Sequence, residues 1–314
     1  MKIVFLNSIG LKKDYLLDKA RNILGNEHEL VCYDQVSYDP EVLAQRGKDA
    51  EIMIIDSIKV GSSVLQECPN LKMISVAFTG VDHVDLDYCK EHNITVSNAA
   101  GYSTVAVADY TMATAVNVFR KIVDSAILCK ETRHKLHVGY ELEGLTFGIV
   151  GLGPIGQRVA KLANAYGCNV IAYNRSKKDI PDVKQVELEY LLKNADVVSL
   201  HIPLNYETRN FISKDEINLM KPTSILINTA RGPIVDSKAL ADALKEGKIA
   251  GAGIDVFTKE PPTVESEPLM SAPNTVLTGH IAFASIQSFE KRADIVINNI
   301  KAWLDGTPQN VVSK

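Results

Sequence analysis

Cysteine is scarce in this 314-residue chain, and its pattern excludes two common uses of the residue. The five cysteines are odd in number and form no C-x-x-C pair; they are Cys32, Cys68, Cys89, Cys129 and Cys168. Such spacing argues against a disulfide framework and against a zinc site, and it favours a reducing compartment. We therefore expect a cytoplasmic protein without a structural metal.

Long apolar runs and blocks of basic charge are also missing. No run reaches the ~18 apolar residues of a membrane helix, and the short apolar start of the chain is not typical of a signal peptide. The net charge is -4, so nothing indicates a nucleic acid or a membrane surface as a partner. The length allows two domains, and 46% hydrophobic with 23% charged residues is ordinary for a globular protein.

The first hundred residues alternate short apolar runs with helical patterns. We predict helices over Leu16–Leu24 and Leu86–His92. The predicted strands are Lys2–Leu6, Ile52–Ile55, Met73–Ala77 and Thr95–Ser97. Strands that alternate with helices favour a parallel sheet covered by helices.

A long helix is predicted next, followed by a second α/β segment. Tyr102–Lys130 contains no proline or glycine, and Ser103 or Thr104 can cap its start. Six buried strands follow, at Phe147–Val150, Asn169–Tyr173, Val197–Leu200, Ser224–Asn228, Ala252–Val256 and Val276–Thr278. Six strands with intervening helices are typical of a doubly wound dinucleotide-binding domain, and a last amphipathic helix is predicted over Phe289–Asp305.

A glycine fingerprint lies directly after the first of these six strands. Gly151, Gly153 and Gly156 form G-x-G-x-x-G between an apolar strand and the predicted helix Gln157–Tyr166. The first glycine permits a tight turn, the second lets the backbone approach a pyrophosphate, and the third allows close packing of helix and strand. This context favours a dinucleotide site over a glycine-rich turn without a ligand.

The end of the next strand indicates which dinucleotide. An acidic residue is expected about 20 residues on in an NAD enzyme, to hold the ribose 2′-hydroxyl. Asn174, Arg175, Ser176 and Lys177 stand there instead, and the basic and hydroxyl side chains suit a 2′-phosphate. NADP(H) is therefore favoured and NAD(H) stays possible, the alternative being a solvated basic loop with relaxed cofactor choice.

Three residues of the C-terminal half carry the chemistry of 2-oxo acid reduction. Arg231, in Asn-Thr-Ala-Arg-Gly, can hold a carboxylate bidentately. His280 can donate a proton to the developing alkoxide, and Glu260 can keep that imidazole protonated. A salt-bridging arginine and a structural histidine are the alternatives for residues of these types taken singly.

Together these segments resemble the D-isomer-specific 2-hydroxyacid dehydrogenases over most of the chain. The matching segments are Ala77–Asp85, Val96–Ser103, Gly151–Gly156, Leu200–Leu204 and those around Arg231, Glu260 and His280. The resemblance implies an α/β protein of two Rossmann-like domains with doubly wound parallel sheets. The dinucleotide-binding domain, residues 101–280, would be inserted in a flavodoxin-like substrate domain, residues 1–100 plus 281–314. The cleft between them would hold the substrate, and the family expectation is a homodimer.

The resemblance also implies individual roles. The backbone amides of Thr79 and Gly80 would receive the substrate carboxylate, and Phe78 would shape the pocket or simply pack in the core. Asp255 would lie near the nicotinamide, and His201 would approach the cofactor or be structural. The remaining cofactor-lining positions are Thr104, Pro154, Ile155, Ile202, Pro203, Thr229 and Ala230. Asp82, His83 and Asp85 have the spacing of a helix cap, and no metal site is expected.

Departures from the family pattern narrow the choice of substrate without identifying it. Arg133–Glu143 is short and lacks tryptophan, which leaves the pocket edge and the assembly open. The chain leaves no room for the regulatory domain of many phosphoglycerate dehydrogenases, and no arginine cluster stands near Thr79. Small unphosphorylated acids such as glyoxylate, hydroxypyruvate or a pyruvate-like compound are therefore favoured. Phosphite and phosphoglycerate dehydrogenases, and a dinucleotide-sensing corepressor-like protein, are the alternatives; Glu260 argues against a formate dehydrogenase.

Overall fold

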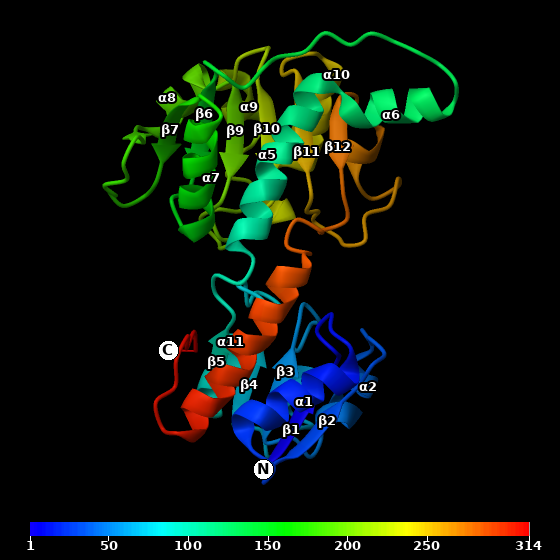
Figure 1. Cartoon of the computed structure of the whole chain (residues 1–314), viewed down its shortest axis with the longest axis vertical. Coiled ribbons are helices and arrows are strands. Elements are labelled where there is room, and N and C mark those ends of the chain that lie inside the picture. The colour runs from blue at the N-terminus through cyan, green and yellow to red at the C-terminus, as the bar shows by residue number, and fades with distance from the viewer. Residues whose placement is uncertain (314) are drawn as a thin grey trace. The chain divides into compact units, whose positions relative to one another are not determined.

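The computed structural model describes residues 1–313, and the chain forms two compact units. The first contains Met1–Ser103 and the chain from Ala284 onward, and the second contains Thr104–Phe283. Lys314, the last residue of the predicted substrate domain, lies outside the described residues. Each unit is an α/β fold around its own parallel sheet (Figure 1).

The first unit has a five-stranded parallel sheet with the order β2-β1-β3-β4-β5. This is the flavodoxin-like order. Its strands are β1 (Lys2–Phe5), β2 (Glu29–Cys32), β3 (Ile52–Ile55), β4 (Met73–Val76) and β5 (Thr95–Asn98). The sequence predicted four of the five. The strand that it missed, β2, is an edge strand with only one buried residue, so it lacks the apolar run of a central strand.

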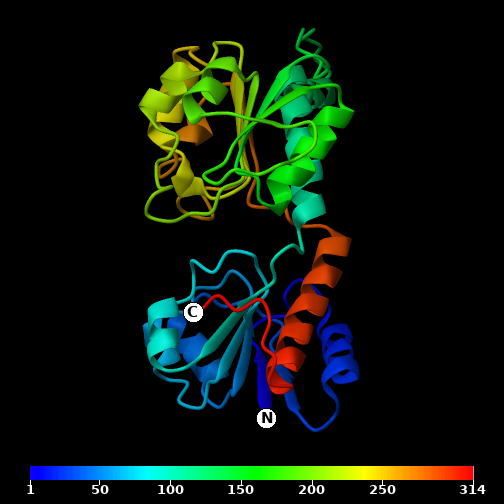
Figure 2. The same ribbon diagram turned by 90° about the vertical axis from the view of Figure 1, so that its left-hand side faces the viewer.

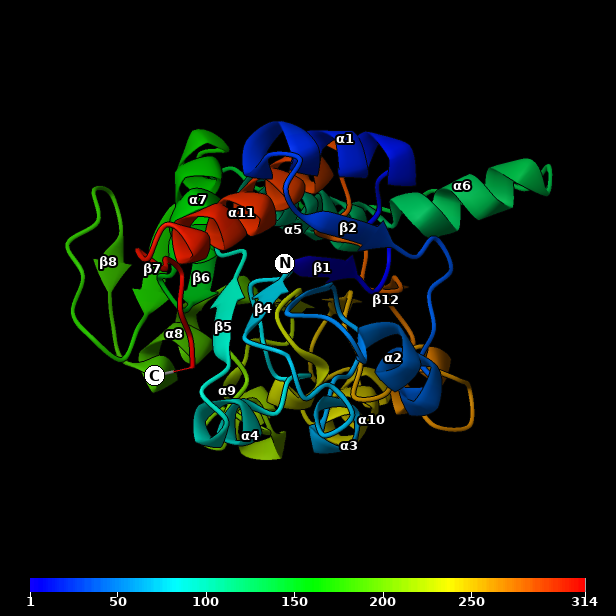
Figure 3. The same cartoon turned by 90° about the horizontal axis from the view of Figure 1, so that it is seen from below.

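Helices cover both faces of this sheet (Figures 2 and 3). The helices are α1 (Lys13–Leu24), α2 (Pro40–Gly47), α3 (Ser62–Leu65), α4 (Leu86–Glu91) and α11 (Ile286–Leu304). The first and last of these pack together on one face, and the other three lie on the opposite face. The expected cap at Asp85 is confirmed, because its carboxylate accepts a 3.0 Å hydrogen bond from the Tyr88 amide at the start of α4.

The second unit has a seven-stranded parallel sheet with the order β12-β11-β10-β9-β6-β7-β8. Its strands are β6 (Thr146–Val150), β7 (Asn169–Tyr173), β8 (Lys184–Gln185), β9 (Val197–Leu200), β10 (Ile225–Asn228), β11 (Gly251–Ile254) and β12 (Thr275–Leu277). Six were predicted. The seventh, β8, is a two-residue edge strand of polar residues, too short to leave a periodic signal. The order confirms a doubly wound nucleotide-binding topology.

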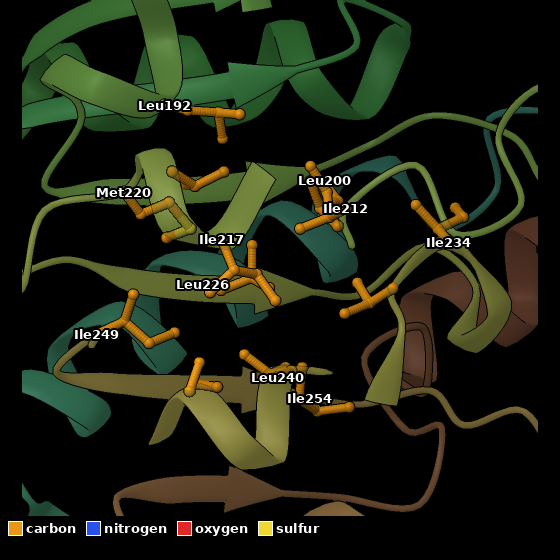
Figure 4. Packing of buried hydrophobic residues seen from close by; sticks show 14 of the residues in the cluster. Leu192, Leu200, Ile212, Ile217, Met220, Leu226, Ile234, Leu240, Ile249 and Ile254 are labelled. Carbon is orange, nitrogen blue, oxygen red and sulfur yellow. The ribbon is translucent and has the colours of Figure 1, made fainter. Parts of the chain in front are cut away.

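Two apolar cores lie on the two faces of this sheet. One is formed with α8 (Leu188–Asn194), α9 (Lys214–Leu219) and α10 (Ser237–Lys245), and Figure 4 shows its aliphatic side chains. The other is formed with α5 (Thr104–Arg120) and α7 (Pro154–Ala165). Two 3₁₀ turns, Gly232–Ile234 and Pro268–Ser271, complete the unit. Among residues 1–313, no helix is both long and apolar enough to cross a bilayer.

The prediction of one helix over Tyr102–Lys130 is wrong. Two helices, α5 and α6 (Ile122–Lys130), are separated by Lys121, whose backbone is left-handed with φ 50° and ψ 46°. The Asn117 side chain accepts a hydrogen bond from the Val123 amide (3.1 Å), which stabilises the break. No glycine or proline marks it, so the sequence carried no signal. No residue of α6 is buried within the chain.

Candidate active site

In the second unit, the expected catalytic residues lie at the carboxyl ends of the strands of the sheet. Gly151 follows β6, Arg231 follows β10, Asp255 follows β11 and His280 follows β12. The carboxyl ends of parallel strands meet at the same edge, and β10, β11 and β12 are neighbours in the sheet. This edge is where open α/β sheets bind ligands.

Glu260 and His280 form a hydrogen-bonded pair. The Nδ1 of His280 lies 2.8 Å from Oε2 of Glu260, and the other carboxylate oxygen accepts a hydrogen bond from the Phe257 amide (3.0 Å). Burial opposes ionisation of Glu260, but the hydrogen bond from His280, its charge, the Phe257 amide and the charge of Arg231 together lower the pKa of Glu260. The carboxylate is therefore ionised at neutral pH and fixes the orientation of the imidazole.

Arg231 belongs to the same group of side chains. Its positive charge contributes to the lowered pKa of Glu260, so the two lie within electrostatic reach of each other. One guanidinium nitrogen donates to the carbonyl of Ala230 (2.8 Å). The structure thus brings Arg231, Glu260 and His280 together, within one unit of the chain.

Asn228 holds the loop that carries Arg231. Its side chain accepts from the Ala230 amide (3.0 Å) and donates to the Arg231 carbonyl (2.9 Å), and it is only 1% exposed. The sequence reading missed this residue. The available signal was an amide side chain at the very end of an apolar strand, directly before a catalytic loop.

The backbone at His280 is also held tightly. Its φ is 54°, a left-handed conformation that is uncommon for a residue with a side chain. The His280 amide donates to the Asp255 carbonyl (2.6 Å), and the Asp255 carboxylate accepts from the amides of Ile281 and Ala282 (both 2.9 Å). Burial raises the pKa of Asp255, although these bonds and the bond from Thr278 oppose the shift.

The glycine loop has the shape that a dinucleotide requires. Gly151 has φ 102°, and a Cβ on Gly156 would lie 2.0 Å from the Gly151 carbonyl oxygen, so neither tolerates a side chain. A Cβ on Gly153 would meet no atom within 4 Å, so space is open above this glycine. Helix α7 begins directly after it, with Pro154 and Ile155 in its first turn and no side chain capping its amides. Open space at an uncapped helix N-terminus fits a pyrophosphate.

The loop after β7 lies against the glycine loop. The Asn174 side chain accepts from the Leu152 amide (2.9 Å) and donates to the Ser176 carbonyl (2.7 Å). Arg175 is 86% exposed and pairs at 3.2 Å with Glu207. Lys178, which the sequence reading did not single out, donates to the Leu152 carbonyl (2.9 Å). Asn174 thus places an amide at the end of β7, where an NAD enzyme is expected to have a carboxylate.

The other expected cofactor-lining residues of this unit take varied positions. A Cβ on Gly151 would lie 2.8 Å from Cγ2 of Ile202, so the loop after β9 adjoins the glycine loop. His201 contacts Ser199 through Nε2 (2.8 Å), and burial lowers the pKa of this imidazole to about 3, so it is neutral at pH 7. Its protein partner supports the structural alternative. The last positions lie at the loop after β9 (Pro203), after β10 (Thr229, Ala230) and at the first residue of α5 (Thr104).

The expected substrate loop, Phe78, Thr79 and Gly80, follows β4 in the first unit. Phe78 is 6% exposed, and its ring packs edge-on against Tyr102 with centroids 5.9 Å apart. The guanidinium of Arg292, on α11, lies 5.4 Å from the Phe78 ring centroid. Phe78 thus packs within its own unit. The Thr79 carbonyl accepts a 2.7 Å hydrogen bond from Asn98.

A dinucleotide fold with an arginine and a Glu–His pair at its ligand-binding edge defines a class of proteins, the nicotinamide-dependent oxidoreductases. Comparison with known families narrows this class. Residues 112–282 match the model of the D-isomer specific 2-hydroxyacid dehydrogenase, NAD binding domain. The chain belongs to the D-isomer-specific 2-hydroxyacid dehydrogenase family, and it is an NAD(P)-dependent enzyme acting on CH–OH groups.

Several curated proteins are similar to the chain. A hydroxypyruvate reductase from Blautia hydrogenotrophica is 34% identical, with 100% of both chains covered. A glyoxylate reductase from Thermococcus litoralis is 38% identical, with 87% of this chain and 86% of the relative covered. A D-3-phosphoglycerate dehydrogenase from Methanocaldococcus jannaschii is 38% identical over 87% of this chain but only 53% of its own length.

Solved structures agree with this assignment. An acyclic imino acid reductase in complex with NADPH and D-Arg superposes with a TM-score of 0.89 at 31% identity, covering 99% of this chain and 100% of that one. An NADPH-dependent glyoxylate/hydroxypyruvate reductase from Sinorhizobium meliloti gives 0.86 at 26% identity, covering 99% and 97%. The family and fold inferred from the sequence are therefore confirmed.

Proposed function

We propose that this enzyme reduces a small unphosphorylated 2-oxo acid, glyoxylate or hydroxypyruvate before pyruvate-like acids, to the D-2-hydroxy acid, with NADPH as the preferred reductant. The observation that carries the proposal is the 2.8 Å Glu260–His280 pair with Arg231 beside it, at the sheet edge that also holds the glycine loop. The reductases named above support the substrate class.

The residues of the second unit have distinct tasks in this reaction. A bound nicotinamide supplies the hydride. Arg231 pairs with the substrate carboxylate and polarises the 2-oxo group. His280 donates a proton from Nε2 to the carbonyl oxygen, because Nδ1 is held by Glu260, and it accepts the proton in the reverse direction. The ionised carboxylate of Glu260 holds Nδ1 of His280 and so fixes the orientation of the ring.

The loop at Thr79 and Gly80 is also proposed to contact the substrate carboxylate. The backbone amides of Thr79 and Gly80 would bind the carboxylate, and a glycine permits the close approach. Phe78 anchors this loop by packing against Tyr102. A single added methylene in such a pocket changes binding by only ~1–3 kcal/mol, so the acid must be identified by assay.

The preference for NADPH rests on the loop after β7. Asn174 presents no charge to repel a 2′-phosphate, and the exposed Arg175 and the Ser176 hydroxyl can bind it. The Asn174→Asp and Arg175→Ala variants should weaken NADPH binding about tenfold or more, by charge repulsion and by loss of a charged hydrogen bond, and leave NADH binding unchanged or stronger. Titration of both dinucleotides by nucleotide fluorescence measures this, with Lys184→Ala as the matched surface control.

The test of the function is a steady-state assay. NADPH and NADH oxidation would be followed with glyoxylate, hydroxypyruvate, pyruvate and phosphohydroxypyruvate, and phosphite oxidation in the opposite direction. Turnover with the first two acids, faster with NADPH, supports the proposal. Turnover confined to phosphohydroxypyruvate or phosphite makes the enzyme one of the rival dehydrogenases. Dinucleotide binding without any turnover points to a sensing protein.

We further propose that the protein is a cytoplasmic homodimer. Helix α6 contributes nothing to the core of its own chain, and it exposes Ile122 (48%), Val123 (44%) and Ile127 (51%). An apolar helix face of this kind is typical of an interface between subunits. The described cysteines are all free and four of the five are buried, which suits a reducing compartment.

A further inference from the structure

A network of side-chain hydrogen bonds connects Tyr110, which has been given no role so far, to Asp255 and the backbone that follows His280. It joins helix α5 to the end of β12 through side chains: the Tyr110 hydroxyl lies 2.5 Å from the Thr278 hydroxyl, which lies 2.6 Å from Oδ1 of Asp255. Tyr110 and Thr278 are 168 positions apart in the sequence. Every member belongs to the second unit.

This series of hydrogen bonds leads to the backbone that carries the imidazole of His280. The same oxygen of Asp255 accepts from the Ile281 amide, and its other oxygen accepts from the Ala282 amide. These are the two amides that follow His280, whose left-handed backbone is strained and persists only because its surroundings hold it. The carboxylate is 1% exposed, so water does not replace a missing partner easily.

The direction of each hydrogen bond follows from the chemistry of the groups. Both oxygens of Asp255 face amide donors, the arrangement of an ionised carboxylate, which only accepts. Thr278 has a single hydroxyl proton and must give it to this carboxylate. Its oxygen can then only accept, so Tyr110 donates to Thr278. The Thr114 side chain, one turn further along α5, hydrogen-bonds the Tyr110 oxygen in turn.

We propose that Tyr110 is a positioning residue for the proton donor: acting through Thr278 and Asp255, it holds residues 280–282 so that the His280 ring stays aligned for transfer. The proposal rests on the proposed function, since it concerns the same imidazole. It predicts that loss of the Tyr110 hydroxyl reduces the rate of turnover and leaves substrate and dinucleotide binding unchanged, because this hydroxyl is hydrogen-bonded to Thr278 and Thr114 inside the protein.

Matched variants test the proposal in the full-length enzyme. Tyr110→Phe removes one oxygen, Thr278→Val replaces the hydroxyl with a methyl group, and Thr278→Ser keeps the hydroxyl. Tyr110→Phe and Thr278→Val should each lower kcat about three- to tenfold, as expected for a lost buried hydrogen bond, at constant KM and constant Kd for NADPH. Thr278→Ser should keep most of the wild-type kcat.

A double variant separates positioning from simple packing. If both residues act through one chain, Tyr110→Phe combined with Thr278→Val should cost little more than Thr278→Val alone. Losses that multiply, a Thr278→Ser variant as slow as Thr278→Val, or a Tyr110→Phe variant with wild-type kcat would each overturn the proposal.

Hydrogen–deuterium exchange gives a readout that does not need turnover. The amides of Ile281 and Ala282 should exchange faster in Tyr110→Phe than in the wild type, while amides of β6 should not change. Unchanged exchange at residues 281 and 282 would contradict the proposal. A wild-type enzyme inactive with every 2-oxo acid would instead contradict the proposed function, and the exchange result would still decide whether Tyr110 holds this backbone.

Discussion

At the scale of single residues, the proposed chemistry depends on an imidazole that a carboxylate holds in one orientation. The Nδ1 of His280 is held by Glu260, Nε2 is the proposed proton donor, and the His280 side chain is 24% exposed. The pair is reachable and yet fixed in orientation. Proton donation by a positioned imidazole accelerates a reaction by about 10²–10⁴-fold.

Replacement of His280 by alanine should therefore remove most turnover. We expect kcat to fall about 10²–10⁴-fold in His280→Ala, while the Kd for NADPH stays within about twofold, because the glycine loop is untouched. Stopped-flow absorbance and a binding titration measure the two quantities. A variant that still turns over at the wild-type rate would refute the role of proton donor, and a lost melting transition would show instead that the fold had failed.

The lowered pKa of Glu260 predicts a pH-dependent contribution to stability. A carboxyl whose pKa is lower in the folded state than its ordinary value of 4.5 stabilises the fold above that value, and the contribution disappears as the pH falls through the folded pKa. The difference in melting temperature between the wild type and Glu260→Gln should be constant from pH 6 to 5 and shrink below about pH 4.5. The side chain is 37% exposed, so solvent screening keeps the effect small. A difference that grew on acidification would contradict the assignment.

The sequence singled out the proposed catalytic residues but not the groups that hold them. Arg231, Glu260 and His280 stand in local motifs with distinctive neighbours, so they could be singled out one at a time. Asn228 had a local signal in its place at the end of an apolar strand, but Tyr110 had none, because a tyrosine acquires such a role only from a partner. The partner of Tyr110 is 168 residues away and meets it only after folding.

At the scale of elements, the turn from β6 into α7 contains two glycines that are needed for different reasons. Gly156 is required by the fold, since its Cβ would press on a backbone carbonyl, whereas Gly153 faces open space in an ordinary extended conformation with φ -68° and ψ -177°. Gly156 thus serves packing, and Gly153 is proposed to leave space for the ligand.

Alanine substitutions should separate these two uses. Gly156→Ala should destabilise the enzyme by about 1–3 kcal/mol, the usual cost of overpacking. Gly153→Ala should melt like the wild type and bind NADPH about tenfold or more weakly, because its methyl group occupies the space proposed for the pyrophosphate. Calorimetry and dinucleotide titration of both variants measure this. Tight NADPH binding by Gly153→Ala would show that the phosphates lie elsewhere.

Helices and strands with a strong hydrophobic pattern could be predicted from the sequence. Short edge strands and the break between two helices could not. The central strands β6, β9 and β10 are buried and mostly apolar because helices cover both of their faces. Strands β2 and β8 lie at sheet edges, with less burial and therefore less pattern. The break at Lys121 is fixed by side-chain contacts to Asn117 and Asn274, which no local propensity reveals.

At the scale of the whole molecule, the exposed apolar face of α6 predicts that charged substitutions there convert the proposed dimer to monomers. In the Ile122→Glu/Ile127→Glu variant, two charges would have to be buried in the proposed interface, so the dimer should dissociate. Light scattering coupled to size exclusion should give the mass of two chains for the wild type and of one chain for the variant. Val36→Glu, which changes a similarly exposed apolar residue (52%) in the other unit, is the control and should stay dimeric. A monomeric wild type would contradict the proposed homodimer.

The order of the units along the chain has a consequence for how the protein is made. Helix α11 packs on α1, β4 and β5, and the buried Ser75 hydroxyl donates to the Val296 carbonyl (3.0 Å), 221 residues later. During synthesis the second unit, Thr104–Phe283, emerges in one piece and can close its core at once. The first unit must wait until Ile286–Leu304 leaves the ribosome, because α1 alone covers only part of one face of its sheet. The earliest part of the chain to be translated is therefore the last to reach its native state.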